Sequence, residues 1–338
     1  MDKWYLNHEK NDDIVFSVRV RLARNFSGFP FPNKMTDEQK FSVIQKVSDA
    51  INNSSVRKEF NFVDINKLSE NELYSLVERH IISPDFAKNT IGRALILNEN
   101  ESVSVMINEE DHIRIQSIST GLEFSKAYEK ALMIENIIGN AVEYAYDEQF
   151  GFLTECPTNL GTGMRASAMV HLPALEKVGA LGELFNSIAK MGITVRGMFG
   201  EGSKSQGCMY QISNQITLGI SETDAIKNIE NIINQIIKKE TEVRNSFDKL
   251  NIEDLVSRAF GTLKYAKLIS SKEMLLLLSD VRLGVSMGIL KLPISVINEL
   301  NLTCGSACIS ADQSNTLTAI QRDKKRAEII RNKLESIN

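Results

Sequence analysis

The chain has 338 residues, of which 43% are hydrophobic and 24% charged, and a formal net charge of −4. This composition is typical of a globular protein with an apolar core, and its acidic balance argues against broad nucleic-acid binding. No apolar stretch reaches the roughly 18–20 residues that span a bilayer, and the N-terminus lacks the apolar core of a secretory signal, so we expect a cytoplasmic protein without a membrane span.

The first predicted element is a strand from Ser17 to Leu22. Arg19 and Arg21 alternate there with apolar residues, so both arginines project from one face of the strand. Two guanidinium groups on one face can each hold a pair of phosphate oxygens, whereas a solvent-exposed strand edge is the other interpretation of this pattern. Arg19 and Arg21 are therefore candidates for binding a polyphosphate.

Two helices and three strands are predicted next. An amphipathic helix covers residues 36–52, and a capping box of Ser69 and Glu72 begins a second helix that reaches residues 78–80. His80 is a candidate base or phosphate contact, with a polar helix cap as the alternative. The strands are predicted at residues 94–97, 102–107 and 113–118.

Three consecutive acidic residues, Glu109, Glu110 and Asp111, lie between the last two of these strands. Adjacent carboxylates repel one another, so core packing gives no reason to place them together, although an acidic turn would. Arg114, four residues after Glu110, projects from a strand toward a phosphate. The cation that best fits carboxylates beside phosphate-binding arginines is a guanidinium group. The pattern therefore favours phosphoryl transfer from ATP to a guanidine.

The remaining elements fall into two groups. Before residue 250 the pattern predicts helices at residues 122–147, 173–191 and 223–245, and strands at residues 150–154, 166–172, 193–198 and 209–212. After it only helices are predicted: residues 252–269, one begun by a Ser270–Glu273 capping box, and residues 315–334. We therefore expect an α+β catalytic domain over residues 1–250 and an all-helical C-terminal domain over residues 251–338.

The sequence lacks the common backbone-amide cradles for phosphate. Gly161-Thr162-Gly163 matches a dinucleotide-binding fingerprint only weakly, because no βαβ unit surrounds it, and there is no Walker A motif. An ATP enzyme of this kind must neutralise the phosphates with side chains. The dispersed arginines meet that need.

The four cysteines are too few for a disulfide framework in a chain of this size. Cys304 and Cys308 are four residues apart, as in a helical metal site, but no neighbouring Cys or His pair completes a tetrahedral set. We expect reduced thiols and no metal bound by the protein.

Five ordered segments together resemble the guanidino (phosphagen) kinases, which include the creatine and arginine kinases, and within them the bacterial protein-arginine kinases. The segments are residues 19–25, residues 108–114, residues 156–161 with 165–167, residues 196–197 with 200–203, and residues 211–215. They span most of residues 14–220. The resemblance implies a catalytic domain with a largely antiparallel sheet flanked by helices.

The resemblance also implies a reaction that uses ATP and Mg²⁺, and it assigns roles to single residues. Glu110 would orient and deprotonate the acceptor guanidinium, whose pKa above about 12 leaves no free lone pair at neutral pH, and Glu201 would supply a second carboxylate. Cys156 matches a reactive cysteine that modulates activity. The nucleotide-binding positions would be Ser17, Val18, Arg19, Val20, Arg21, His80, Arg114, Arg165, Ala166, Ser167, Ala168, Met169, Arg196, Gly197, Met198, Phe199, Gly200 and Glu201.

Three positions depart from the family pattern. Val18 replaces a usual Ser or Thr, which would loosen one phosphate contact. Phe199 replaces an arginine of the arginine kinases, although the protein-arginine branch has an aromatic residue there. Lys204 replaces a glutamate of the arginine-binding branches, so we expect weaker affinity for the acceptor.

The acceptor is expected to be an arginine on a protein surface. Small-guanidine kinases carry a helical domain of roughly a hundred residues before the first arginine strand, whereas Arg19 lies near the start of this sequence. The open site implied by that difference would admit a protein. Two alternatives stay open: a kinase for a small guanidine, and a non-catalytic adaptor that binds phosphoarginine.

The C-terminal region carries a second signature, Arg322-Asp323-x-x-Arg326, which resembles the phosphoarginine-binding allosteric site of the protein-arginine kinases. Arg322 and Arg326, one helical turn apart, would clamp a phosphate while Asp323 meets the guanidinium; ion pairs on a surface helix are the alternative. Residues 263–290 resemble a dimerisation region. The family likeness further implies homodimers, a zinc-containing activator protein, a Clp-type unfoldase as partner, and a role in stress response and protein quality control.

Overall fold

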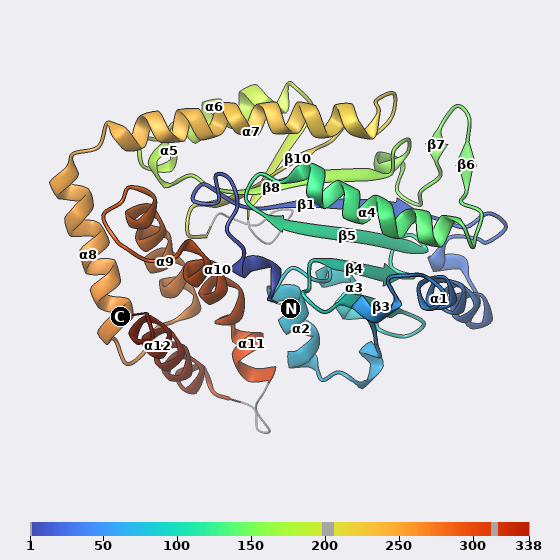
Figure 1. The fold of residues 1–338 in the computed structure, drawn as a ribbon, viewed down its shortest axis with the longest axis horizontal. Coiled ribbons are helices and arrows are strands. Elements are labelled where there is room, and N and C mark those ends of the chain that lie inside the picture. The colour runs from blue at the N-terminus through green and yellow to red at the C-terminus, as the bar shows by residue number, and fades with distance from the viewer. Residues whose placement is uncertain (1, 198–205, 312–316, 338) are drawn as a thin grey trace.

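The structure, a computed structural model, describes residues 2–197, 206–311 and 317–337. Its strands are Val15–Arg24 (β1), Phe60–Val63 (β2), Ala94–Asn98 (β3), Val103–Ile107 (β4), Ile113–Thr120 (β5), Tyr146–Asp147 (β6), Gly151–Phe152 (β7), Met164–His171 (β8), Ile193–Gly197 (β9) and Met209–Asn214 (β10). Eight of these form one sheet in the order β2-β3-β4-β5-β1-β8-β10-β9, and each neighbouring pair is antiparallel (Figure 1). β6 and β7 form a separate two-stranded ribbon.

The helices are Asp37–Asn52 (α1), Glu70–Glu78 (α2), Pro84–Lys88 (α3), Phe124–Gly139 (α4), Pro173–Lys177 (α5), Leu181–Ala189 (α6), Glu222–Asn245 (α7), Lys249–Tyr265 (α8), Ser271–Ser286 (α9), Ile294–Thr303 (α10), Ser306–Ala311 (α11) and Ala319–Glu335 (α12). A short turn of 3₁₀ helix, Trp4–Leu6 (η1), precedes β1. The α+β fold with a flanked antiparallel sheet and a helical C-terminal region is confirmed.

One face of the sheet is covered by helices and forms the main core. Alternate residues of β1, Val18, Val20 and Leu22, are fully buried against α1, α4, α6 and α7. Burying each such side chain contributes about 1.5–3 kcal/mol. Because strand side chains alternate, this stripe forces Arg19 and Arg21 onto the opposite face.

The opposite face is covered only in part. At one end α2 and α3 pack on Leu95 of β3 and Met106 of β4. At the other end Trp4 of η1 packs with Phe16 and with Leu302 of α10. The arginine side chains lie between these two small clusters. The uncovered strip of sheet is where the candidate site forms.

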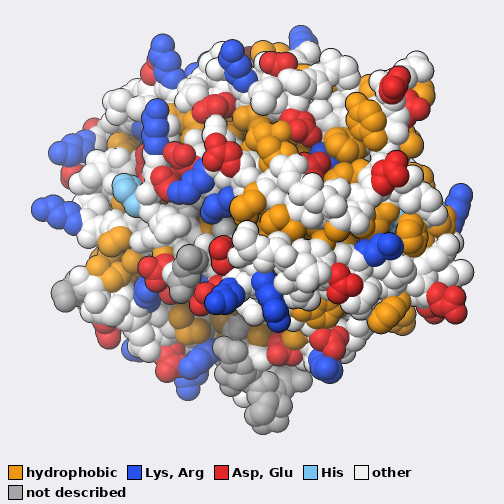
Figure 2. Space-filling model, turned by 45° about the vertical axis from the view of Figure 1, so that its right-hand side comes forward, with side chains coloured by type: hydrophobic (Ala, Val, Ile, Leu, Met, Phe, Trp, Pro, Cys, Tyr) orange, Lys and Arg blue, Asp and Glu red, His pale blue; other side chains and the backbone are white. Residues whose placement is uncertain are grey.

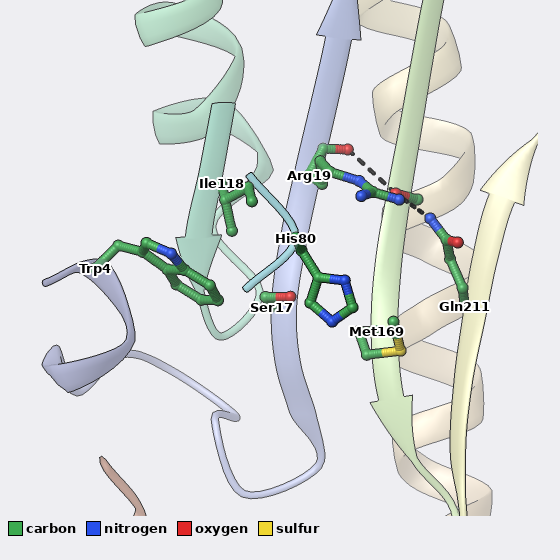
Figure 3. Close-up of a pocket in the computed structure, with 8 residues that line it drawn as sticks. Trp4, Ser17, Arg19, His80, Ile118, Met169 and Gln211 are labelled. Carbon is green, nitrogen blue, oxygen red and sulfur yellow. Dashed lines mark hydrogen bonds between the residues drawn. The ribbon is translucent and has the colours of Figure 1, made fainter. Parts of the chain in front are cut away.

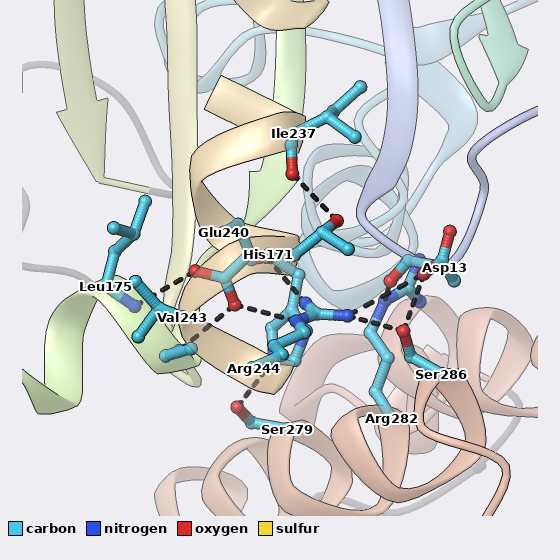
Figure 4. A network of polar contacts seen from close by, with 12 residues as sticks. Asp13, His171, Leu175, Ile237, Glu240, Val243, Arg244, Ser279, Arg282 and Ser286 are labelled. Atoms are coloured by element: carbon cyan, nitrogen blue, oxygen red, sulfur yellow. Dashed lines mark hydrogen bonds and ion pairs between the residues drawn. The ribbon is translucent and has the colours of Figure 1, made fainter. Parts of the chain in front are cut away.

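The C-terminal helices have their own apolar core, built from α8, α9, α10 and α12. A buried polar network joins them to the rest of the chain (Figure 4). In it Arg244 of α7 pairs with Glu240 and Asp13, while His171 of β8 contacts Ser279 of α9. The proposed division near residue 250 follows this change from sheet to helices and stays a prediction.

Two predicted helices are wrong in length. The helix predicted over residues 122–147 ends at Gly139 as α4, because the chain turns back there and the Tyr144 hydroxyl donates to the Glu135 carbonyl oxygen. The helix predicted over residues 173–191 is broken into α5 and α6 at Gly179, whose φ of +73° ends the first helix.

The other elements agree with the prediction to within a few residues. The strand predicted over residues 150–154 is shortened to β7, and the helices predicted over residues 252–269 and 315–334 begin or end a few residues away, as α8 and α12. The capping boxes of Ser69 with Glu72 and of Ser270 with Glu273 are both formed. Among the described residues no helix is both long and apolar enough to cross a membrane.

Candidate active site

Three adjoining cavities form one groove across the exposed strip of the sheet. Their empty volumes, which include solvent-open space, are about 290 Å³ for the inner cavity, 640 Å³ for the middle one and 1210 Å³ for the outer one. Arg19 and His80 line both the inner and the middle cavity. Arg21, Arg114 and Arg196 line both the middle and the outer cavity. The shared residues make the three cavities one continuous groove, which we call the arginine groove.

All five arginines predicted from the sequence line the arginine groove. Arg19 and Arg21 come from β1, Arg114 from β5, Arg165 from β8 and Arg196 from β9. The sheet register places Arg21 directly opposite Arg165. Four strands that are distant in sequence thus bring one positive cluster together.

Two of these arginines, Arg19 and Arg21, carry positive charge that no carboxylate among the described residues neutralises. Burial lowers the pKa of Arg19 to about 10, and repulsion from Arg114 and Arg165 adds to this effect. Burial and repulsion from Arg19, Arg114 and Arg165 lower the pKa of Arg21 well below its usual value. Among the described residues no carboxylate forms an ion pair with Arg19 or Arg21, and Arg21 Nε lacks a hydrogen-bond partner. Buried charges are normally paired, so the groove is built for an anion.

His80 reaches the inner end of the groove from the end of α2. Burial lowers its pKa to about 3, with a further contribution from Arg19, so the ring is neutral at physiological pH. Figure 3 shows His80 beside Ser17 of β1 and Met169 of β8, with Trp4 on the other side. This end of the groove is mostly apolar, unlike the arginine-lined middle.

The backbone of His80 has an unusual conformation. His80 N–H donates to Val77 O, and Ile81 N–H donates to Leu76 O, which is the Schellman pattern of a helix end. The central residue of that pattern is left-handed and is usually glycine, yet here it is His80 with φ +61°. Such strain costs roughly 1–2 kcal/mol and marks functional positions.

The turn between β4 and β5 sets the positions of three carboxylates. It is closed by a hydrogen bond from Asn108 N–H to His112 O at 2.9 Å. The Glu109 carboxylate is buried and pairs with Arg114 at 2.5 Å, and it accepts a hydrogen bond from Ser83 Oγ. Asp111 is also buried and accepts hydrogen bonds from Asn25 Nδ2 and from the backbone N–H of Glu155, in the loop after β7. Both carboxylates are therefore structural.

Glu110 differs because its carboxylate faces the outer cavity and is about one-third exposed. It lies 3.1 Å from Arg114 Nη2. Burial raises the pKa of Glu110, Arg114 opposes this effect, and Asp111 and Glu109 reinforce it. A hydrogen bond from Cys156 also acts on the carboxylate. A carboxylate whose pKa is raised toward neutrality is suited to accept a proton.

Cys156 lines the outer cavity together with Glu110, and its predicted modulatory role stays a prediction. Its Sγ lies 3.0 Å from Thr158 Oγ1. Two hydrogen bonds hold the loop that carries Cys156. Asp111 Oδ1 accepts the Glu155 N–H at 2.9 Å, and Asn25 Nδ2 donates to Leu153 O. The acidic turn thus positions both Glu110 and Cys156.

Four predicted nucleotide-binding residues do not bring their side chains to the groove. Val18, Val20, Ala166 and Ala168 are fully buried in the main core, on the opposite face of the sheet from Arg19 and Arg165. The substitution at Val18 therefore fills the core and removes no side-chain contact from the groove. Ser17, Ser167 and Met169 lie on the groove face, and Gly197 ends β9 beside Arg196. Met198, Phe199, Gly200, Glu201 and Lys204 lie outside the described residues.

The C-terminal signature forms a different arrangement from the expected clamp. Arg326 is fully buried; its Nε donates to Cys304 O at 2.9 Å and its Nη1 donates to Ile269 O at 2.8 Å and to Asp323 at 2.7 Å. Arg322 Nη1 instead donates to Leu317 O at 2.7 Å. In this arrangement both guanidinium groups donate to backbone carbonyls, and the binding of phosphoarginine by Arg322, Asp323 and Arg326 stays a prediction.

Sequence reasoning missed several residues that line the groove. Gln116 lies two residues after Arg114 on the same face of β5, so the strand period could have identified it. Gln211 pairs in register with Arg196, and this required knowledge of the strand order. Trp4 carried no signal in the sequence, because only the fold brings η1 to the groove.

No metal cage exists within the described part of the chain. There no group of three or more His, Cys, Asp or Glu side chains is placed to hold an ion. Mg²⁺ commonly binds through substrate phosphates and a few carboxylates, so the arginine groove is compatible with a cation that enters on a nucleotide.

Comparisons with known proteins agree with this geometry. A family model described as ATP:guanido phosphotransferase, C-terminal catalytic domain, matches residues 42–243. Another, described as Protein-arginine kinase McsB C-terminal domain, matches residues 249–338. The chain is 45% identical to a protein-arginine kinase of Caldanaerobacter subterraneus subsp. tengcongensis, over 95% of this chain and 97% of that protein. It is 41% identical to a protein-arginine kinase of Clostridium novyi, over 100% of this chain and 99% of that protein.

Solved structures show the same fold. A lombricine kinase matches with a TM-score of 0.63 at 23% identity, over 71% of this chain and 70% of that chain. The duplicated taurocyamine kinase from Schistosoma mansoni, with bound transition-state-analogue components, matches with a TM-score of 0.62 at 25% identity. That match covers 79% of this chain and 40% of that chain.

Proposed function

The chain belongs to the ATP:guanido phosphotransferase family and is a protein-arginine kinase, and from this premise we propose how its residues divide the reaction. ATP would lie along the arginine groove with its nucleoside at the inner end, near Trp4, His80 and Met169. Its phosphates would extend past Arg19 and Arg21. The arginine of a substrate protein would enter the outer cavity at Glu110. One observation carries this proposal: a single groove joins Arg19 and Arg21, which pair with no carboxylate among the described residues, to a carboxylate with a raised pKa.

The proposed chemistry uses the two ends of the groove together. A guanidinium nitrogen of the substrate arginine loses a proton to Glu110 and attacks the γ-phosphorus of ATP. The new P–N bond forms while the bond from the γ-phosphorus to the bridging oxygen breaks, and ADP leaves with that oxygen. Arg114 pairs with Glu110 at 3.1 Å, so it holds the carboxylate beside the phosphate-binding arginines. Bound Mg²⁺ would neutralise phosphate charge during the transfer.

This proposal is tested by mapping phosphorylation on an unfolded protein incubated with the enzyme, ATP and Mg²⁺, with the sample kept from acid because P–N bonds are labile. We expect phosphate on arginine. Glu110→Gln keeps the size of the side chain but removes the base, so we expect the rate to fall by about 10²–10⁴-fold. Glu148→Gln, at an exposed position away from the groove, serves as the control. Phosphate on serine, or full activity of Glu110→Gln, would overturn the assignment.

We further propose the cellular role implied by the family likeness. Phosphoarginine would mark proteins for a Clp-type unfoldase, a zinc-containing activator would regulate the kinase, and the chain would form a homodimer through its C-terminal helices. The structure supports only the last idea with a feature of its own, since Tyr265, Leu268 and Leu276 are exposed apolar side chains on or between α8 and α9. Analytical ultracentrifugation of the wild type and Leu276→Asp tests the dimer; a monomeric wild type would exclude it.

A further inference from the structure

One wall of the arginine groove is the segment from Glu78 to Pro84, which we call the His80 wall. Four residues of this wall, His80, Ile82, Ser83 and Pro84, line the middle cavity. The wall is held at its centre by Gln116 Nε2, which donates to His80 O at 2.8 Å. Its far end is held by Ser83, which donates to Glu109. Gln116 and Ser83 both line the middle cavity.

The near end of the wall is held by the C-terminal helices. Glu78 is the last residue of α2, two residues before His80. Its carboxylate accepts two backbone hydrogen bonds from α11, one from Ala307 N–H at 3.0 Å and one from Cys308 N–H at 2.8 Å. Hydrogen bonds to a carboxylate are roughly twice as strong as those between neutral groups. We call this pair of bonds the Glu78 hook.

The packing around the hook is tight. A β-carbon added at Gly305 would lie 2.1 Å from Glu78 Oε2 and 2.4 Å from its carboxyl carbon. Only a residue without a side chain at position 305 therefore leaves room for the carboxylate. Gly305 has no positive φ, so alanine there would conflict with the hook and not with its own backbone.

The segment that receives the hook is fixed on its other side by Arg326. Arg326 Nε donates to Cys304 O, and Arg326 Nη2 donates to Ser306 Oγ at 3.3 Å. A continuous series of contacts thus leads from α12, through residues 304–308, to Glu78 and His80. None of these groups touches the outer cavity where the acceptor would bind.

We propose that Glu78 is a positioning residue for nucleotide binding, which places His80 at the inner end of the groove and transmits the position of residues 304–308 to it. The inference rests on the proposed function, because it takes the arginine groove as the ATP site. Releasing the hook lets the near end of the wall move, while Gln116 and Ser83 still hold the rest. The consequence is weaker ATP binding with little change in the chemical step.

The experiment releases the hook from both sides. Glu78→Ala removes the carboxylate, Glu78→Gln keeps its size but leaves a single acceptor oxygen, and Gly305→Ala displaces an intact carboxylate. We expect the ATP dissociation constant, measured by calorimetry, to rise about tenfold in Glu78→Ala and Gly305→Ala and less in Glu78→Gln. The kcat at saturating ATP should stay within twofold. The double variant Glu78→Ala with Gly305→Ala should bind ATP no more weakly than either single variant, because both act on one contact.

Matched controls separate this effect from general destabilisation. Glu70→Gln removes an exposed carboxylate at the start of α2, and Gly261→Ala adds a β-carbon in α8 with no atom within 4 Å. Both should leave ATP affinity unchanged. Unchanged ATP affinity in all three hook variants, a fall in kcat without a change in affinity, or additive effects in the double variant would each overturn the proposal. Calorimetry needs no turnover, so a failure of the arginine-kinase assay would count against the proposed function and not against this inference.

Discussion

Three consecutive carboxylates in the turn between β4 and β5 have different roles because their surroundings differ. Glu109 is buried against Arg114 and Ser83, and Asp111 is buried against Asn25. Only Glu110 faces the outer cavity. Glu109 and Glu110 share Arg114, while Asp111 accepts from Asn25, so these partners offset the repulsion among the three carboxylates.

The pH dependence of catalysis should report the raised pKa of Glu110. Burial raises that pKa, so the carboxylate form needed as a base is lost as pH falls through a value above the usual 4.5. We therefore expect the acid limb of the kcat profile to lie above pH 4.5. Cys156→Ser keeps a hydroxyl donor beside Glu110, so its acid limb should lie close to that of the wild type.

His80 should contribute no limb of its own to that profile. Burial holds its pKa at about 3, so the ring stays neutral throughout the range in which the kinase is assayed. His80→Gln should weaken ATP binding and leave the acid limb in place. A limb that moves with His80→Gln would show that the histidine, and not Glu110, titrates in catalysis.

The left-handed backbone at His80 predicts that two substitutions differ in stability but not in ATP binding. Glycine at this position relieves the strain of a β-carbon at φ +61°, whereas alanine keeps it. His80→Gly should therefore be more stable than His80→Ala by about 1 kcal/mol in urea unfolding. Both variants should lose the same ATP affinity, because both lose the ring. Equal stabilities would mean that the helix end is not strained in solution.

At the scale of elements, the sequence predicted strands and caps well because their causes are local. Alternation placed Arg19 and Arg21 on one face of β1, and capping boxes located the starts of α2 and α9. The helix over residues 122–147 was too long because its apolar stripe continues past Gly139. A contact between distant residues ends it, since Ala145 N–H donates to Asn25 O. No local pattern contains that information.

The site was predicted only in part, because some of its contacts join residues that are distant in sequence. The five arginines, Glu110 and Cys156 were identified, and the structure places them along one groove. Glu78 accepts a hydrogen bond from a residue more than 200 positions away in the sequence, and Arg326 donates to a backbone carbonyl. A sequence pattern shows neither kind of contact. The sequence therefore contained no sign that Arg326 is fully buried and donates to two backbone carbonyls, and its predicted role in binding phosphoarginine stays a prediction.

The loop before β8 depends on Gly161 for a close backbone contact. Its φ is +99°, and a β-carbon there would lie 2.2 Å from the carbonyl oxygen of Thr217. Thr217 also donates from its Oγ1 to Thr158 O, in the loop that places Thr158 and Asn159 at the edge of the outer cavity. Gly161→Ala should therefore destabilise the protein by about 3 kcal/mol in urea unfolding. Gly182→Ala, where no atom lies within 4 Å, is the control.

At the scale of the whole molecule, the N-terminal segment joins the sheet to the C-terminal helices. Acidic and basic side chains are interspersed on the surface in Figure 2, so that face shows no large patch of one charge. The two arginines that join the two parts, Arg244 and Arg282, are instead buried. The Arg244 guanidinium contacts Asp13, and Arg282 of α9 reaches the backbone of both Asp12 and Asp13. The start of β1 is thus attached to α9.

Arg282 should be the most sensitive residue of this junction. It is nearly fully buried, donates to Asp12 O, to Asp13 O at 3.1 Å and to Asn298 Oδ1 at 2.6 Å, and lies over the Phe16 ring. Arg282→Ala leaves buried carbonyl oxygens without donors, so we expect the free energy of unfolding to fall by about 3 kcal/mol. Arg258→Ala, which removes an exposed arginine of the neighbouring α8, should not change it measurably.

Arg282→Ala should also change the inner end of the arginine groove. Phe16 packs on Trp4, which lines the inner cavity and is the chain's single tryptophan. Trp4 fluorescence in the folded protein should therefore respond both to ATP and to Arg282→Ala, and ATP affinity should fall in the variant at temperatures well below its unfolding midpoint. If Arg282→Ala unfolds earlier but binds ATP with wild-type affinity, the junction stabilises the two parts without shaping the groove. A variant as stable as the wild type would mean that the helices are held to the sheet by apolar contacts such as Leu302 against Trp4, which the substitution leaves intact.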